Sequence, residues 1–241
     1  GRSVSSLITG RIAVTLELGL VSCIITTILG LVIGVLSAVK QYSALDYTAS
    51  ALAIIFSAMP NFWMAVLGIL IFSTRLHWLP ASGLGSFKNW IMPVICNSLG
   101  PVCLILRTTR STMLDVINQD YIRTARAKGV SERQVILRHA LKNAIIPTIT
   151  VIGMQLSLVV GGSVVVETIF NINGLGLLMM NSINNRDYPT IQGIVLLLAV
   201  TVCVINLLVD LAYAAVDPRI KAQYVGSVGK KSRAKKKEAA A

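Results

Sequence analysis

The chain has 241 residues, of which 54% are hydrophobic and only 13% are charged. A soluble domain carries roughly a quarter charged residues, so this composition argues against a water-soluble globular protein, and the apolar content excludes intrinsic disorder. The 22 basic residues exceed the 10 acidic ones, which gives a net charge of +12, and the charges lie in blocks between long uncharged runs. This layout is typical of a polytopic membrane protein rather than of a basic nucleic-acid-binding domain.

Five stretches without Asp, Glu, Lys or Arg are long enough, or nearly long enough, to cross a bilayer. A bilayer core of about 30 Å needs roughly 20 apolar helical residues. No period-two alternation dominates any stretch, so a β-barrel is not expected, and helices then remain as the way to satisfy the backbone in lipid. We predict an all-α polytopic membrane protein with five transmembrane helices, over residues 18–39, 47–74, 89–106, 143–166 and 188–209.

The first two stretches carry features that bear on helix packing. Gly30 and Gly34 place two small residues about one turn apart, and this spacing lets another helix approach closely. The second stretch is too long for one straight crossing. We expect Pro60 near its middle to kink it, or else its first turns to lie at the membrane interface.

The longest connection between the stretches, residues 107–142, is predicted to fold into helices. Asp120 is expected to cap a helix that runs to Lys128, and Gly129 suits the position just after its end. The run Ser131-Glu-Arg-Gln fits a capping box that opens a second helix, which continues into the fourth span. The connection therefore contains a short basic helix, a glycine turn and a second helix.

Three functions remain open for this connection. The first is a basic surface loop that is attracted to anionic lipid, the second is a DNA-reading helix-turn-helix, and the third is a docking element for a cytoplasmic partner. The membrane spans on both sides would hold a DNA-reading element at the bilayer, which disfavours that function. The docking element is supported by the small residues Ala125 and Ala127, and by Arg126 and Lys128, which can pair with acidic groups.

The basic residues predict the orientation of the chain. Of the 22 Lys and Arg residues, 17 lie in connections on the side that holds residues 40–46, and five lie on the other side. Because Lys and Arg accumulate in cytoplasmic loops, we predict that residues 40–46 and 107–142 are cytoplasmic. With five spans the chain would begin outside and end inside, so we expect one further span upstream of Gly1.

Three parts are predicted along the chain. Residues 1–11 would form an extracytoplasmic N-terminal segment, and residues 12–219 would form the transmembrane domain with its cytoplasmic loop. Residues 220–241 include the run Gly-Lys-Lys-Ser-Arg-Ala-Lys-Lys-Lys and are predicted to form a disordered basic tail in the cytoplasm.

Several motifs resemble landmarks of one family. Residues 121–129 and 138–147 closely resemble the cytoplasmic loop signature called EAA, in the form found in the dipeptide, oligopeptide and nickel branch of ABC importer permeases. The resemblance covers residues 11–219. Its other motifs are Pro60-Asn-Phe-Trp, Trp78-Leu-Pro-Ala-Ser-Gly, Gly161-Gly-Ser-Val-Val-Val-Glu, Gly174-Leu-Gly, Asn185-Arg-Asp-Tyr-Pro and Asp217-Pro-Arg.

The resemblance implies a type I importer permease fold with six spans, of which the first is missing here. It implies a second, homologous permease subunit, two ATPase subunits that bind ATP and Mg²⁺, and an extracytoplasmic substrate-binding protein. The chain itself would be a transport subunit without enzymatic activity, cofactor or nucleic-acid partner. It would lie, in contact with lipid, in the cytoplasmic (inner) membrane of a bacterium or archaeon.

In the family the EAA loop seats in a groove of the ATPase, so the resemblance implies a coupling role for the equivalent residues. Two departures stand out. Arg123 lies where the general signature begins with Glu, and Asn173 lies where the family often has Pro. The expected coupling residues are Tyr121, Thr124, Ala125, Arg126, Ala127, Lys128 and Gly129.

The resemblance leaves the transported solute open between peptides and nickel. Seven Met and two His residues form no evident metal cluster, which favours peptides. Transport would proceed by alternating access, driven by ATP binding and hydrolysis on the partner subunits. A gradient-driven channel or secondary carrier is the alternative from another class.

No catalytic constellation is expected. His77 and His139 are the only histidines and lie on opposite sides of the predicted membrane, so they cannot share a metal site. Glu167 ends the fourth span and is a candidate for the outer gate or for binding-protein contact, or else a helix-end carboxylate that faces water. Polar side chains inside spans are candidates for the transport path, although each could equally form an interhelical hydrogen bond. These path candidates are Asn97, Ser98, Gln155, Ser157 and Asn206.

Overall fold

The chain folds as a bundle of helices. In the computed structural model the backbone is described for residues 3–216, and the side chains are described for residues 3–156 and 163–211. The predicted tail and the Asp217-Pro-Arg motif lie outside the described residues. The helices are α1 (Val4–Val39), α2 (Ala44–Ala58), α3 (Asn61–Gly68), η1 (Ile69–Arg75), α4 (Phe87–Ile117), α5 (Asp120–Ala127), α6 (Glu132–Gln134), η2 (Val135–Ala140), α7 (Leu141–Gly162), α8 (Val164–Ile169), α9 (Leu175–Asn184) and α10 (Tyr188–Val216).

The predicted transmembrane helices are present, with different limits. In the described part, α1, α4, the continuous helix from Glu132 to Leu156, and α10 are each long and apolar enough to cross a membrane. A fifth crossing results if the bent pair α2 and α3–η1 counts as one span. Because α1 begins at Val4, most of the predicted N-terminal segment belongs to this helix.

The second span is broken rather than merely kinked. The axes of Ala44–Ala58 and Asn61–Arg75 meet at 103°. Pro60 precedes α3, and Met59 before it has extended backbone angles, φ −85° and ψ 127°. A residue before proline is driven out of the helical region by the proline ring, so α2 ends here. The predicted kink is thus confirmed, and it is sharp enough to turn the chain sideways.

The close helix pair at the centre of the bundle is α1 with α4. A Cβ atom added at Gly30 would lie 2.6 Å from Cγ2 of Ile105, and one added at Gly34 would lie 2.7 Å from Cβ of Thr109. No side chain larger than hydrogen fits at either position without movement. The predicted close approach at the two glycines is therefore confirmed, with α4 as the partner helix.

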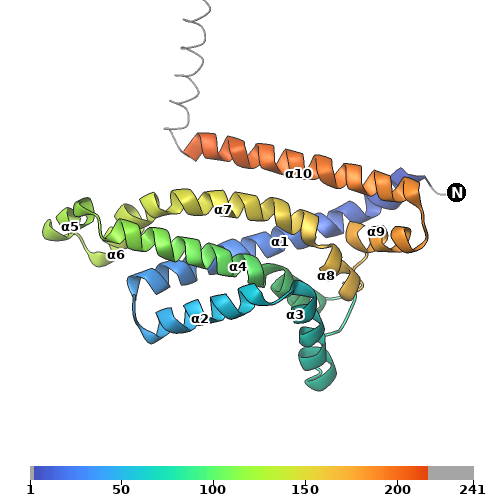
Figure 1. Ribbon diagram of the computed structural model, residues 1–241, viewed down its shortest axis with the longest axis horizontal. Helices are drawn as coiled ribbons and strands as arrows, with labels where there is room; N and C mark the ends of the chain where they lie inside the picture. Colours follow the sequence, from blue (N-terminus) through green and yellow to red (C-terminus); the bar gives the residue numbers. More distant parts are fainter. Residues whose placement is uncertain (1–2, 217–241) are drawn as a thin grey trace, which may run out of the picture.

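The two ends of the bundle differ, and both are visible in Figure 1. We call the end that holds residues 40–43 and α5 the basic end, and the end that holds α8 and α9 the far end. Each end has its own buried apolar cluster. The basic-end cluster is centred on Met113, Ile122 and Val135, and the far-end cluster is centred on Leu18 and Phe170.

Candidate coupling and transport sites

Helix α5 carries a buried face and an exposed face. Ile122 and Ala125, three residues apart, are buried against Met113 of α4 and Val135 of η2. Because residues three apart lie on the same side of a helix, this pair fixes how α5 is rotated on the bundle. The opposite face is exposed and presents Arg123, Thr124, Ala127 and Lys128.

The end of α5 is built on Gly129, as predicted. Its φ of +77° lies in the left-handed region, which glycine adopts without steric cost. The N–H of Gly129 donates to the carbonyl of Arg126 at 3.0 Å, and the N–H of Val130 donates to the carbonyl of Ala125 at 3.3 Å. A Cβ atom at Gly129 would meet nothing within 4 Å, so the backbone conformation rather than crowding requires the glycine.

Two side-chain contacts tie α5 to the helices that follow. The Arg126 guanidinium donates to both carboxylate oxygens of Glu132, at 3.1 and 2.7 Å. This hydrogen-bonded pairing raises the pKa of Arg126 above its usual value. At the other side of α5, the amide of Asn143 donates to the hydroxyl of Tyr121 at 2.9 Å. These contacts join the short helix to α6 and α7, in addition to its buried face.

Two capping predictions for this region are wrong. Asp120 is the first residue of α5 rather than its cap, because the chain leaving α4 already turns at Gln119. Ser131 precedes α6 but its side chain forms no capping hydrogen bond, since its backbone carbonyl accepts from the N–H of Gln134 instead. Ala125 packs in the basic-end cluster and is 8% exposed, and its predicted part in coupling stays a prediction.

The remaining coupling candidates share the exposed surface of α5 and its turn. Thr124 also donates its hydroxyl to the carbonyl of Asp120 at 3.0 Å, as is common for threonine within a helix. The exposed candidates are Tyr121, Thr124, Arg126, Ala127, Lys128 and Gly129.

The path candidates do not converge on one surface. Asn97 donates to the hydroxyl of Ser22 at 3.3 Å, and Ser98 donates to the carbonyl of Ser22 at 3.1 Å, so both join α4 to α1. Gln155 is buried on α7, and Asn206 occupies an exposed position on α10. The side chain of Ser157 lies outside the described residues. For Asn97 and Ser98 the structure therefore shows the alternative role, an interhelical hydrogen bond.

Glu167 is completely buried at the far end, at 0% exposure. One carboxylate oxygen accepts from the hydroxyls of Thr15 and Ser163, at 2.9 and 2.7 Å. The other accepts from the backbone N–H groups of Gly176 and Leu177, at 2.6 and 3.3 Å. It therefore does not face water, which corrects the alternative of a water-facing helix-end carboxylate; its role at the outer gate stays a prediction.

The two glycines of Gly174-Leu-Gly176 leave room for this carboxylate and for the backbone of α8. A Cβ atom at Gly174 would lie 2.4 Å from Oε2 of Glu167, and one at Gly176 would lie 2.5 Å from the Cα of Val164. The N-terminus of α9 can then approach the charge, where its free N–H groups and helix dipole favour an anion. Thr15 completes the arrangement by accepting from the N–H of Leu175 at 2.8 Å. The α8–α9 hairpin is thereby fastened to α1.

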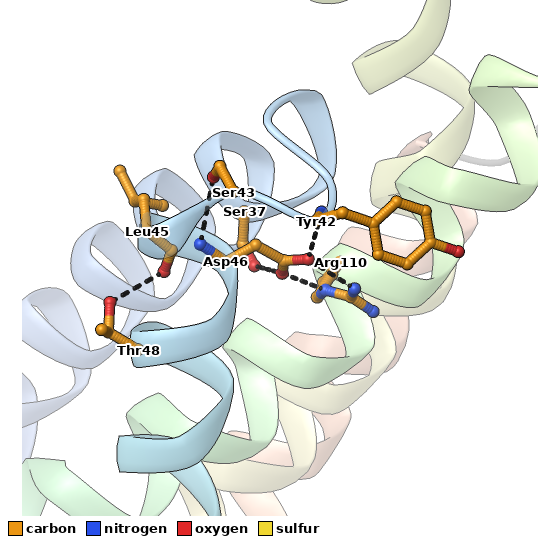
Figure 2. A network of polar contacts seen from close by, with 7 residues as sticks. All are labelled: Ser37, Tyr42, Ser43, Leu45, Asp46, Thr48 and Arg110. Carbon is orange, nitrogen blue, oxygen red and sulfur yellow. Dashed lines mark hydrogen bonds and ion pairs between the residues drawn. The ribbon is translucent and has the colours of Figure 1, made fainter.

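A second buried carboxylate, Asp46, was not singled out from the sequence. It lies at the basic end and is 2% exposed. The Arg110 guanidinium donates to its two oxygens from Nε and Nη2, at 2.6 and 2.8 Å. The hydroxyl of Ser37 and the N–H of Tyr42, the latter at 3.0 Å, donate as well, as Figure 2 shows. One aspartate thus joins α1, α2, α4 and the turn between the first two helices.

The sequence does hold a signal for Asp46. Ser43 and Asp46 have the Ser-x-x-Asp spacing of a helix start, and the Ser43 hydroxyl accepts from the N–H of Asp46 at 3.3 Å. Tyr42 in the preceding turn adopts a φ of +62°, which aims its N–H at the carboxylate. The distant partner, Arg110, could be found only from the fold.

Comparisons with known proteins agree with this architecture. Residues 30–222 match the family described as the binding-protein-dependent transport system inner membrane component. A putative peptide permease protein of Brucella suis is 43% identical over 91% of this chain and 72% of its own length. The dipeptide transport system permease protein of Bacillus subtilis is 42% identical over 91% of this chain and 71% of its own.

The fold also matches a solved structure. A chain from an inward-facing structure of the MetNI methionine ABC transporter superposes with a TM-score of 0.73, covering 88% of this chain and 97% of that one at 22% identity. The family match and the relatives cover most of the sequence, including both buried carboxylates and α5. This chain therefore belongs to the family of binding-protein-dependent transport system inner membrane components, which are multi-pass proteins of the inner membrane.

Proposed function

We propose that the chain is the permease subunit of an ATP-driven importer of peptides. As the membrane component of a binding-protein-dependent system, it works with ATPase and binding-protein partners. We further propose two ATPase subunits, which hold ATP and Mg²⁺, and a second, homologous permease subunit. The chain itself would use no cofactor. Relatives named as peptide and dipeptide permeases, at 42–43% identity, support peptides as the solute.

The observation that carries the coupling part of the proposal is the division of α5 into two faces. The buried pair Ile122 and Ala125 packs α5 against α4, η2 and α7. A displacement of α5 would therefore move these helices with it. The exposed face offers two small or short side chains, Thr124 and Ala127, beside the basic Arg123 and Lys128. A groove with acidic groups on the ATPase would match this face in both shape and charge.

Transport then follows as movement of rigid bodies. ATP binding would close the two ATPase subunits, displace α5, and tilt the spans until the path opens toward the binding protein. Hydrolysis would reset the path toward the cytoplasm. Nickel as solute, and gradient-driven transport without an ATPase, are the outcomes that would displace this proposal.

Substitution of Gly129 by valine tests the coupling role. A β-branched residue at φ +77° is strained by roughly 1–3 kcal/mol, which should displace the turn and uncouple ATP hydrolysis from uptake. We expect basal ATPase activity to persist, whereas its stimulation by the binding protein and the uptake in proteoliposomes should both fall by at least tenfold. Gly85→Val is the matched control, because its Cβ also meets nothing within 4 Å and its φ is not positive. Normal coupled uptake in Gly129→Val would contradict the proposal.

The solute and the energy source are tested in the same proteoliposomes. We expect uptake of a labelled dipeptide to require ATP inside, the binding protein outside and the ATPase subunits, and to be unaffected by dissipating ion gradients. Uptake of nickel in preference to dipeptide would show that the transported solute is nickel and not a peptide. Dipeptide uptake that is driven by an ion gradient without the ATPase subunits would show that the protein is a secondary carrier.

A further inference from the structure

A cleft of about 530 Å³ with a mixed polar and apolar lining opens between α2 and α4, beside the pair of Asp46 and Arg110 and apart from α5. It lies on the exposed side of α4. We call it the α2–α4 cleft, and its lining residues are Ser50, Ile54, Leu104, Arg107, Thr108, Arg110, Ser111 and Thr112.

The cleft carries one uncompensated positive charge. The guanidinium of Arg110 is paired with Asp46 through two hydrogen bonds, so these two charges cancel. Arg107 is exposed, and within the part of the chain that the structure describes it makes no hydrogen bond or ion pair. Thr108, the next residue on α4, and Ser111, one turn further along, add hydroxyl groups to the same lining. The chemistry suits an anion with several oxygen atoms.

The polarity of the cleft changes with depth in the membrane. Helix α2 starts at Ala44 at the basic end, so at 1.5 Å per residue Ser50 lies about 9 Å and Ile54 about 15 Å along it. On α4, which runs the opposite way, Leu104 lies about 4.5 Å deeper than Arg107. The mouth at the basic end is therefore cationic and hydroxyl-rich, whereas the inner part is apolar.

The apolar part is open rather than filled. The side chains of Ile54 and Leu104 are 62% and 46% exposed. A free phosphate ion would use only the mouth and leave these side chains uncovered, whereas a phospholipid covers both parts with one molecule.

We propose that the α2–α4 cleft binds an anionic phospholipid of the cytoplasmic leaflet. Its phosphate group pairs with Arg107 and accepts from the hydroxyls of Thr108 and Ser111, and its acyl chain lies along Ile54 and Leu104. Basic pockets between transmembrane helices on the cytoplasmic side are the sites where anionic head groups bind. The proposal rests on the orientation that the basic residues predict and not on the identity of the solute.

The assembled transporter, purified in detergent, tests the site. It is incubated with mixed micelles of equal phosphatidylglycerol and phosphatidylcholine, and the lipid that co-elutes is measured by mass spectrometry. We expect phosphatidylglycerol to be enriched, and Arg107→Gln to lower the enrichment about fivefold, the effect of one basic residue near an anionic head group. Arg107→Lys keeps the charge and should retain most of the enrichment.

Two further variants distinguish specific binding at the cleft from a general effect of losing a basic residue. Arg75, an exposed arginine at the end of η1 on the predicted outer side, serves as the matched control, and Arg75→Gln should leave the enrichment unchanged. Ile54→Ser should weaken retention of the lipid, and it tests the same site if Arg107→Gln fails to assemble.

Four results would overturn the proposal. Unchanged enrichment in Arg107→Gln would remove the site, and equal retention of phosphatidylcholine would remove the preference for an anionic lipid. Full displacement of the lipid by excess inorganic phosphate would show that the site takes free phosphate. Efficient disulfide cross-linking of Ser111→Cys to a cysteine on the second permease subunit would show that protein covers the cleft.

Discussion

The two ends of this molecule each bury a carboxylate, and they stabilise it by different means. At the far end, all four donors to Glu167 are neutral: two hydroxyls and two backbone N–H groups. At the basic end, Asp46 receives two hydrogen bonds from the cationic Arg110, whose side chain is 27% exposed. The far-end site thus depends on donors placed by the fold, whereas the basic-end site depends on a counter-charge that reaches water.

This difference determines how each carboxylate site responds when its hydrogen-bonding partners move. A buried charge without a counter-ion is stable only while its hydrogen-bond donors are held in place, so the far end must be rigid. At the basic end Asp46 is also buried, but Arg110 is partly exposed, so the guanidinium can exchange its partner for water at moderate cost. The basic end therefore has the more adaptable of the two carboxylate sites.

The largest effect is expected when the Glu167 carboxylate is removed. Glu167→Ala leaves two buried N–H groups and two hydroxyls without their acceptor and should lower the free energy of unfolding by about 3 kcal/mol or more. Glu167→Gln should lose less, because one amide oxygen can still accept. The measurement is thermal unfolding of the purified transporter, together with protease sensitivity between α8 and α9.

Glu17→Ala is the control for this prediction. Glu17 lies on α1 near Thr15 but is exposed, so its removal should change stability by less than about 0.5 kcal/mol. Equal stability of Glu167→Ala and Glu17→Ala would show that the far end does not depend on the buried carboxylate.

An intermediate effect is expected at the basic end. Asp46→Asn leaves the partly exposed Arg110 without a counter-charge and should cost about 2 kcal/mol, and Arg110→Gln should cost more because it leaves the buried Asp46 carboxylate unpaired. The double variant should recover about 1 kcal/mol relative to the sum of the single ones. Strict additivity in thermal unfolding would show that the two side chains are not coupled, and the contrast with Glu167 would then fail.

The smallest effect is expected at the exposed pair of Arg126 and Glu132. Their side chains are 39% and 56% exposed, so Glu132→Gln should lower stability by about 0.5 kcal/mol or less. High salt should abolish the difference between the wild-type protein and this variant, since exposed charges are screened. A loss as large as that of Asp46→Asn would mean that α5 depends on this pair and not on its buried face.

Much of the fold was predictable because it depends on local composition. Within the described residues, uncharged runs of sufficient length predicted the four long apolar helices and the bent pair, and Pro60 predicted the break in that pair. Gly30 and Gly34 predicted a close helix contact, and Gly129 predicted the end of α5. These predictions hold because each depends on the conformation or size of the residue itself.

The site was only partly predictable, because exposure and pairing are not local. Ala125 belongs to the recognisable loop signature yet faces the core, and Glu167 ends a span yet does not reach water. Asn97 and Ser98 were candidates for a path and instead join two helices. In each case the residue type allowed two roles, and the neighbouring helix decided between them.

The sequence by itself determined the membrane class, the family resemblance and the position of the short helix α5, because length, charge and glycine placement constrain the chain one residue at a time. Only the tertiary structure decided which carboxylate meets an arginine and which meets a helix N-terminus. Thr15 and Glu167 are 152 residues apart in sequence, and Asp46 and Arg110 are 64 apart. Contacts over such separations arise from helix packing, which no local pattern encodes.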